Sequence, residues 1–298
     1  MRVLLLGADT PLGMALEQYL EDSGRHEFEA IGAISGRWRS ERHAKKVVRR
    51  ARPEVVVDAR LQSAVDGGEA LSDLDVERCH WLAKACQRGG ASYLLLSSSQ
   101  VFAGEQERPY TEQDVPDSAE AAGHRLRRAE ALAAQGCERH LLLRLGPVFS
   151  WRGRNPLTRM LEGMLEGTLT VSTHLRSCPV AAREAARVVA AVLDQLGSGA
   201  DAWGVFHYAS AETTTCYEFA ETILASASQF AVLGDQAVTL LEAPAGQRSL
   251  TRRLDCNRLR DTFAIRQLPW RDFVADAVKL YFNQPLESLC ERRELTEN

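Results

Sequence analysis

Long apolar runs are missing from this 298-residue sequence. No stretch approaches the roughly 20 apolar residues that a membrane-spanning helix needs, and the apolar residues that follow Met1 are too few for a secretory signal. The net charge of −4 gives no electrostatic reason to expect nucleic acid or an anionic membrane as partner. We therefore expect a cytoplasmic protein that binds neither.

A cysteine framework is missing as well. The seven cysteines are an odd number, and no two of them stand in a C-x-x-C pair. Structural disulfides and zinc sites need paired or closely spaced cysteines. We therefore expect reduced thiols and no metal.

Lysine is scarce. Of the 36 lysine and arginine residues, the lysines are only Lys45, Lys46, Lys84 and Lys279. None of the six tyrosines has a lysine four positions later. That spacing would place both side chains on one face of a helix, so no tyrosine of this chain has a lysine one helical turn ahead of it.

What is present is a regular alternation of short apolar runs and amphipathic segments. Runs such as Val55–Val57 and Leu94–Leu96 are typical of strands covered on both faces of a parallel sheet. The predicted strands are Arg2–Leu6, Glu29–Ile34, Glu54–Asp58, Ser92–Ser97 and His140–Leu145. The predicted helices between them are Pro11–Asp22, Ser40–Arg50, Leu74–Gln87 and Ala119–Ala134. Strands joined through helices predict an α/β fold with a Rossmann-type, doubly wound parallel sheet.

A glycine loop follows the first predicted strand and opens the first predicted helix. In that context the run Gly7–Gly13 indicates dinucleotide binding, because the helix terminus offers N–H groups to a pyrophosphate. The candidate cofactor contacts are Gly7, Asp9, Thr10, Leu12 and Gly13. Thr10 replaces the usual middle glycine, and Thr10-Pro11 also suits a helix cap followed by the first helical position. A loop built only to cap a helix is therefore the alternative.

The second strand normally ends in an acidic residue that holds the adenosine ribose. The segment Ile34–Arg39 contains no acid, whereas Arg37 and Arg39 are suited to a 2′-phosphate. If a dinucleotide binds, NADP(H) is the expected one. The alternative is two solvated loop arginines.

The pattern is looser after about residue 150. The predicted elements there are helices Pro156–Glu166, Ala181–Leu196, Cys216–Ala227 and Trp270–Phe282, a strand Val205–Tyr208, a loop Ala243–Gly246 and a charged tail Glu291–Asn298. We expect residues 1–150 to form the dinucleotide-binding domain, completed by roughly 168–210. Residues 151–298 would be mainly a smaller C-terminal α/β lobe that binds substrate.

Several ordered motifs resemble the extended short-chain dehydrogenase/reductases, and among them the dTDP-4-dehydrorhamnose reductase family. The motifs are Gly7–Gly13, Pro53–Ala59, Ser97–Gly104, Pro109–Glu112, Leu143–Phe149, Gly204–Tyr208 and Leu254–Leu259 followed by Trp270. They cover nearly the whole chain in the right order. The resemblance implies a sugar-nucleotide reductase fold that binds a nucleotide or nucleotide-sugar, and a homodimer.

Within the resemblance, Ser98 takes the place of a threonine that hydrogen-bonds the substrate's keto oxygen. The family's catalytic Tyr-Gly-x-x-Lys corresponds to the run that starts at Ala122, with Gly123 and Glu130 holding the register. Ala122 then stands at the tyrosine position and Leu126 at the lysine position. Neither can transfer a proton or lower a tyrosine pKa. Tyr110, which precedes this helix, is a speculative substitute donor.

The lobe that would hold a sugar nucleotide departs from the family too. The segment His174–Val180 keeps only the proline of the family's substrate motif. Specificity for a dTDP-sugar is therefore not implied by this segment.

Three hypotheses for function remain open. The first is a non-catalytic, NADP(H)-binding member that acts by binding a ligand or regulating a partner protein. The second is an active NADPH-dependent dTDP-4-keto-6-deoxy-sugar reductase, in which Ser98 polarises the carbonyl and Tyr110 or water supplies the proton. The third is a scaffold that binds no dinucleotide.

Overall fold

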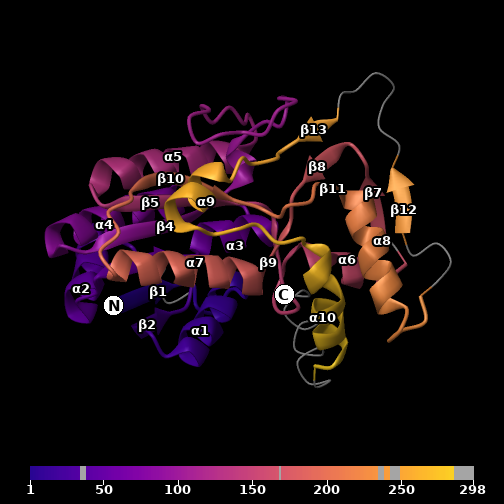
Figure 1. The fold of residues 1–298 in the computed structure, drawn as a ribbon, viewed down its shortest axis with the longest axis horizontal. Coiled ribbons are helices and arrows are strands. Elements are labelled where there is room, and N and C mark those ends of the chain that lie inside the picture. The colour runs from indigo at the N-terminus through magenta and orange to yellow at the C-terminus, as the bar shows by residue number, and fades with distance from the viewer. Residues whose placement is uncertain (34–37, 168, 234–237, 242–248, 285–298) are drawn as a thin grey trace.

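Six parallel strands form the central sheet, in the order β2-β1-β3-β4-β5-β10 (Figure 1). The computed structural model describes residues 1–33, 38–167, 169–233, 238–241 and 249–284. The strands of this sheet are β1 (Arg2–Leu6), β2 (Glu27–Ile31), β3 (Val55–Asp58), β4 (Ser92–Ser98), β5 (His140–Leu145) and β10 (Gly204–Tyr208). All neighbours pair in parallel, so the predicted doubly wound sheet is confirmed.

Helices cover both faces of this sheet and give it two cores. One face packs against α2 (Glu41–Ala51), α4 (Asp73–Gly89) and α5 (Ala121–Gly136). The other packs against α1 (Pro11–Ser23), α7 (Ala182–Gly197) and α9 (Asn257–Phe263). Along β1, Leu4 and Leu6 face the first core, whereas Val3 and Leu5 face the second. This alternation of buried side chains explains why the strands read as continuous apolar runs.

A third core lies beyond the sheet, on the right in Figure 1. It is built on α6 (Pro156–Leu165), α8 (Cys216–Ala227) and α10 (Arg271–Phe282), with Trp270 fully buried at its centre. The short strands are β6 (Val148–Phe149), β7 (Leu169–Ser172), β8 (Leu175–Ser177), β9 (Val180–Ala181), β11 (Thr214–Thr215), β12 (Val238–Leu241) and β13 (Leu250–Thr251). They pair in small two- and three-stranded sheets.

The second strand differs from its prediction. It covers Glu27–Ile31 rather than Glu29–Ile34, because its register follows the five residues of β1 from Arg2↔Glu27 to Leu6↔Ile31. The N–H groups of Gly7 and Ala8 then both donate to the carbonyl of Ile31 and end the pairing. The predicted loop 243–246 and tail 291–298 lie outside the described residues.

Three findings, on membrane-spanning helices, metal-binding groups and cysteines, are stated for the part of the chain that the structure describes. No helix there is long and apolar enough to cross a membrane. No three His, Cys, Asp or Glu side chains there are grouped so that they could hold a metal ion. The six cysteines within that part are free thiols.

Candidate functional site

The carboxyl edge of the sheet has its switch point between β1 and β3. β1 leads into α1 on one face, whereas β2 leads into α2 on the other face. In doubly wound folds the ligand crevice opens where the connections diverge in this way. Here the crevice is bordered by the loop that starts at Gly7 and by the segment that starts at Ala59.

The loop after β1 keeps two glycines that its shape requires. Gly7 has a φ of +84°, in the left-handed region that favours glycine. A Cβ on Gly13 would overlap the carbonyl oxygen of Gly7 and come within 2.9 Å of the Cα of Ala8. The two glycines therefore allow the tight turn and the close helix packing that a dinucleotide-binding loop needs.

The start of α1 is capped by Thr10. Its hydroxyl accepts the N–H of Gly13 at 3.1 Å and donates to the carbonyl of Gly7 at 2.6 Å. Pro11 occupies the first helical position and has no N–H. The predicted helix cap is thus confirmed. A phosphate at this terminus would find one of the first three helical N–H groups missing and another engaged.

The other predicted cofactor contacts of the first two loops have different surroundings. Asp9 accepts the N–H of Ala33 and ties the glycine loop to the end of β2. The Leu12 side chain is buried in the core. Arg39 is exposed, and Arg37 lies outside the described residues. Cofactor binding by Asp9, Leu12, Arg37 and Arg39 stays a prediction.

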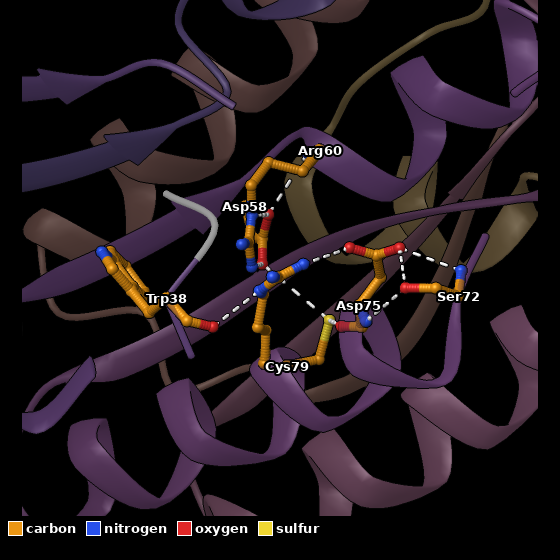
Figure 2. Close-up of polar contacts among 7 residues, drawn as sticks. Trp38, Asp58, Arg60, Ser72, Asp75 and Cys79 are labelled. Carbon is orange, nitrogen blue, oxygen red and sulfur yellow. Dashed lines mark hydrogen bonds and ion pairs between the residues drawn. The ribbon is translucent and has the colours of Figure 1, made fainter. Parts of the chain in front are cut away.

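Arg60, the first residue of α3 (Arg60–Asp66), lies in the crevice beside the glycine loop. A Cβ placed on Gly7 would be 3.1 Å from Cγ of Arg60 and 3.3 Å from its backbone nitrogen. The Arg60 side chain is only 9% exposed. Its Nε and Nη2 donate to the two carboxylate oxygens of Asp58 at 2.8 and 2.7 Å (Figure 2). This bidentate geometry is the strongest pairing that an arginine makes with a carboxylate.

Asp58, at the end of β3, is a fully buried carboxylate. It also accepts the hydroxyl of Tyr93 at 2.8 Å and the backbone N–H of Arg60 at 3.2 Å. Burial alone would raise the pKa of Asp58, but the Arg60 guanidinium and these hydrogen bonds hold that pKa below its ordinary value. Removing one partner of such a buried pair typically costs about 3–5 kcal/mol. The position of Arg60 is therefore strongly held.

A second buried arginine reinforces this region. Arg78 on α4 donates through Nε to the carbonyl of Trp38 at 2.9 Å and through Nη1 to Asp75 at 2.6 Å. The Ser72 hydroxyl accepts the backbone N–H of Asp75, and the Asp75 carboxylate accepts the backbone N–H of Ser72, which together form a capping box at the start of α4 (Figure 2). The guanidinium carbon of Arg60 lies 5.7 Å from the centroid of the Trp38 ring.

A cavity of about 360 Å³ opens against these arginines. Arg60, Leu61, Ser72 and Arg78 are among the residues that line it, and none of residues 7–13 is. Arg60 contacts the glycine loop through Cγ and also lines this cavity. Its side chain therefore separates the two.

The backbone of the crevice is suited to a dinucleotide, whereas the Arg60 side chain is not. The backbone of the glycine loop has the shape that a pyrophosphate requires. The Arg60 side chain, however, lies against Gly7 where the dinucleotide would cross the switch point. As folded, the residues present do not fit NADP(H) in that position.

On the other side of the switch point, α5 is docked in a fixed register. A Cβ on Gly123 would overlap the carbonyl oxygen of Gln100 and come within 2.6 Å of Cβ of Ser118. Further along α5, Glu130 accepts the Ser97 hydroxyl at 2.6 Å and pairs with Arg144 at 2.7 Å. Both contacts of α5 are buried.

The two positions that the resemblance assigns to tyrosine and lysine lie on this docked helix. Leu126 is 0% exposed and belongs to the core between α4, α5 and the sheet, against which the partly buried Ala122 also packs. Lys84, on the neighbouring α4, pairs with Glu41 at 3.5 Å. Ala122 and Leu126 thus contribute packing to this helix and carry no titratable group.

The remaining hydroxyl candidates are engaged in local structure. Ser98, at the carboxyl end of β4, is 1% exposed and accepts the N–H of Gln100 at 3.3 Å. The Tyr110 ring is fully buried and stacks on Phe102 with centroids 4.1 Å apart. Its hydroxyl accepts the N–H of Gly104 at 2.9 Å. Proton donation by Tyr110 would require this stack to open.

The same edge holds polar groups that were not predicted from the sequence. Gln62 donates through Nε2 to Oδ2 of Asp66 at 2.7 Å, and the N–H of Val148 donates to the same oxygen at 3.1 Å. Among the described residues, Asp66 Oδ1, Gln62 Oε1 and Ser99 Oγ are buried without a hydrogen-bond partner. Burial raises the pKa of Asp66 well above its ordinary value. Burial therefore shifts the balance at Asp66 towards the neutral acid in the folded chain.

Known proteins resemble this chain over nearly its whole length. The family described as RmlD substrate binding domain matches residues 1–282. A dTDP-4-dehydrorhamnose reductase of Burkholderia thailandensis is 28% identical over 301 aligned residues, covering 95% of this chain and 100% of that protein. The Escherichia coli enzyme of that name is 24% identical, covering 91% of this chain and 95% of that protein.

Solved structures agree in fold. A dTDP-4-dehydrorhamnose reductase from Clostridium acetobutylicum superposes with a TM-score of 0.78 at 21% identity, covering 94% of this chain and 99% of that one. The Bacillus anthracis dTDP-4-dehydrorhamnose reductase in complex with NADP has a TM-score of 0.75 at 18% identity, covering 94% and 98%. These likenesses establish a Rossmann-like fold.

Proposed function

The chain belongs to the RmlD substrate binding domain family. From that premise we propose that it does not catalyse reduction and instead acts by binding a ligand or a partner protein. The observation that carries this proposal is the buried Leu126. Helix α5 is docked through Gly123 and Glu130, and the residue at the position that the resemblance assigns to lysine is the buried Leu126.

The loss of tyrosine and lysine removes two separate contributions. A tyrosine on α5 would relay a proton to the substrate oxygen, and a lysine one turn later would lower its pKa and bring it towards working pH. Ala122 supplies neither a proton nor a hydrogen bond. Loss of general acid–base catalysis alone costs on the order of 10²–10⁴ in rate.

The residues that remain do not replace this pair. Ser98 has a hydroxyl at the carboxyl end of β4; accepting the N–H of Gln100 leaves its O–H able to donate a hydrogen bond, but a serine hydroxyl does not replace a tyrosine whose pKa is lowered by a lysine. The Tyr110 ring stacks on Phe102, and its hydroxyl accepts the N–H of Gly104. His124, two residues after Ala122, is exposed on α5. Binding without turnover is therefore the activity that this site supports best.

Turnover with a keto sugar nucleotide tests the proposal. NADPH oxidation is followed by absorbance with a dTDP-4-keto-6-deoxy-sugar as substrate. From a typical kcat of about 10 s⁻¹, loss of the acid, which costs a factor of about 10²–10⁴, should leave turnover at or below about 0.1 s⁻¹. Turnover above that value would support the active reductase instead and overturn the proposal.

Ser98→Ala is the matched control for this assay. If residual NADPH oxidation arises in the site, loss of the Ser98 hydroxyl should reduce it further. Oxidation that is unchanged in Ser98→Ala comes from outside the site. Oxidation that is rapid in the wild type and abolished in Ser98→Ala would assign real catalysis to this chain.

A further inference from the structure

The Arg60 side chain lies against Gly7 of the glycine loop and also lines the neighbouring cavity of about 360 Å³. A dinucleotide in a doubly wound fold crosses the switch point beside the glycine loop and extends its adenosine towards the loop after the second strand. In this chain that path runs past Arg60. We propose that the Arg60 side chain divides the crevice and excludes dinucleotides from it.

The first support is steric. Arg60 Cγ lies so close to Gly7 that no ligand atom fits between them. A Cβ added to Gly7 would already be only 3.1 Å from Arg60 Cγ. The guanidinium continues towards the face of the Trp38 ring, 5.7 Å from its centroid. Arg60 thus fills the space that a nucleoside would need.

The second support is energetic. To admit a nucleoside, Arg60 would have to break the hydrogen bonds that its Nε and Nη2 donate to Asp58 (Figure 2). The Asp58 side chain is 0% exposed. That movement would leave a buried carboxylate without its cation. The penalty for breaking a buried pair in this way, about 3–5 kcal/mol, corresponds to a loss of about a hundredfold to several thousandfold in affinity.

The prediction from Arg37 and Arg39 concerns which dinucleotide binds, whereas Arg60 decides whether one binds. The exclusion also stands apart from the missing tyrosine and lysine, because Ala122 and Leu126 lie on α5. Micromolar NADPH binding without turnover in the wild type would overturn the exclusion alone, whereas rapid NADPH turnover in the wild type would overturn both proposals.

The test compares two double variants. Asp58→Asn/Arg60→Ala removes the ion pair as a unit, so that no buried charge is left uncompensated. Asp75→Asn/Arg78→Ala removes the neighbouring pair, which lines the same cavity, whereas the atoms nearest to Gly7 belong to Ala59 and Arg60. NADPH and adenosine 2′,5′-bisphosphate, which is the adenosine half alone, are titrated into each by calorimetry, with thermal melting as the check of folding.

We expect wild type and Asp75→Asn/Arg78→Ala to bind both probes at least about a hundredfold more weakly than Asp58→Asn/Arg60→Ala. Micromolar binding of NADPH by the wild type would overturn the proposal. So would a folded Asp58→Asn/Arg60→Ala with no gain, or an equal gain in the control variant. If Asp58→Asn/Arg60→Ala does not fold, Asp58→Asn/Arg60→Ser carries the same comparison, because it also removes the guanidinium without leaving a buried charge unpaired.

The opened variant also separates this inference from the proposed function. If it gains NADPH binding but does not reduce a keto sugar nucleotide, both proposals stand. If it gains both binding and turnover above about 1 s⁻¹, Arg60 excludes the dinucleotide as proposed, whereas the loss of tyrosine and lysine is not what prevents catalysis.

Discussion

Gly123 on α5 packs so closely on Gln100 that a side chain at position 123 would overlap the Gln100 carbonyl oxygen. This contact places α5 against the segment that follows β4 and thereby fixes where residues 122 and 126 lie. The helix to which the resemblance assigns the catalytic tyrosine and lysine is therefore retained as a structural element. Its retention gives the first prediction.

Gly123→Ala should destabilise the fold by about 1–3 kcal/mol, because the added methyl meets backbone and the Ser118 side chain rather than a flexible chain end. Urea unfolding followed by circular dichroism measures the loss. Gly89→Ala is the matched control, since it also lies in a helix and its Cβ would come no nearer than 3.9 Å to Val48. The control should be neutral or slightly stabilising, as alanine favours helix. Equal effects of the two substitutions would contradict the close docking of α5.

Leu126→Lys should not restore catalysis, either alone or with Ala122→Tyr. Leu126 is 0% exposed within the first core, so the substitution removes buried apolar area and places an ammonium group there without a partner. We expect a loss of about 3 kcal/mol or more in the free energy of unfolding, measured by urea unfolding.

Leu126→Met keeps the volume and should cost less than about 1.5 kcal/mol. A folded Ala122→Tyr/Leu126→Lys variant with reductase turnover would show that position 126 reaches the crevice after all. That result would count against the buried position of Leu126.

How far the sequence predicts this molecule depends on the kind of interaction. β1 and β5 begin and end where the apolar runs Arg2–Leu6 and His140–Leu145 indicate, because burial on both faces leaves little freedom. β2 was displaced because an edge strand takes its register from β1, which its own residues do not reveal. Helix α3 was not predicted, since it is short and starts with the Asp58–Arg60 pairing.

The site divides in a similar way. The glycine turn at Gly7 and the cap at Thr10 depend on local backbone chemistry, which sequence patterns report well. The role of Arg60 depends on its contact with Gly7, 53 positions earlier, and on the burial of Asp58. A signal was present: a carboxylate that directly follows Val55–Val57 must be paired when buried, and Arg60 is two residues away. Its direction over the glycine loop requires the three-dimensional fold.

Asp66 gives the last prediction, which concerns pH. Burial raises the pKa of Asp66 in the folded chain, so the folded state keeps this proton at pH values where the unfolded chain has released it. The associated stability is fully present below the ordinary aspartate pKa of about 3.9 and is lost as pH rises through the folded value. Asp66→Asn does not titrate and keeps an oxygen for the N–H of Val148. Its stability relative to wild type should therefore increase as pH rises above about 4, by up to about 1.4 kcal/mol per pH unit.

Urea unfolding from pH 4 to 8 measures this difference, and Asp66→Ala, which lacks the acceptor, should be less stable than Asp66→Asn at every pH. A difference between Asp66→Asn and wild type that does not change with pH would show that Asp66 titrates alike in the folded and unfolded chains.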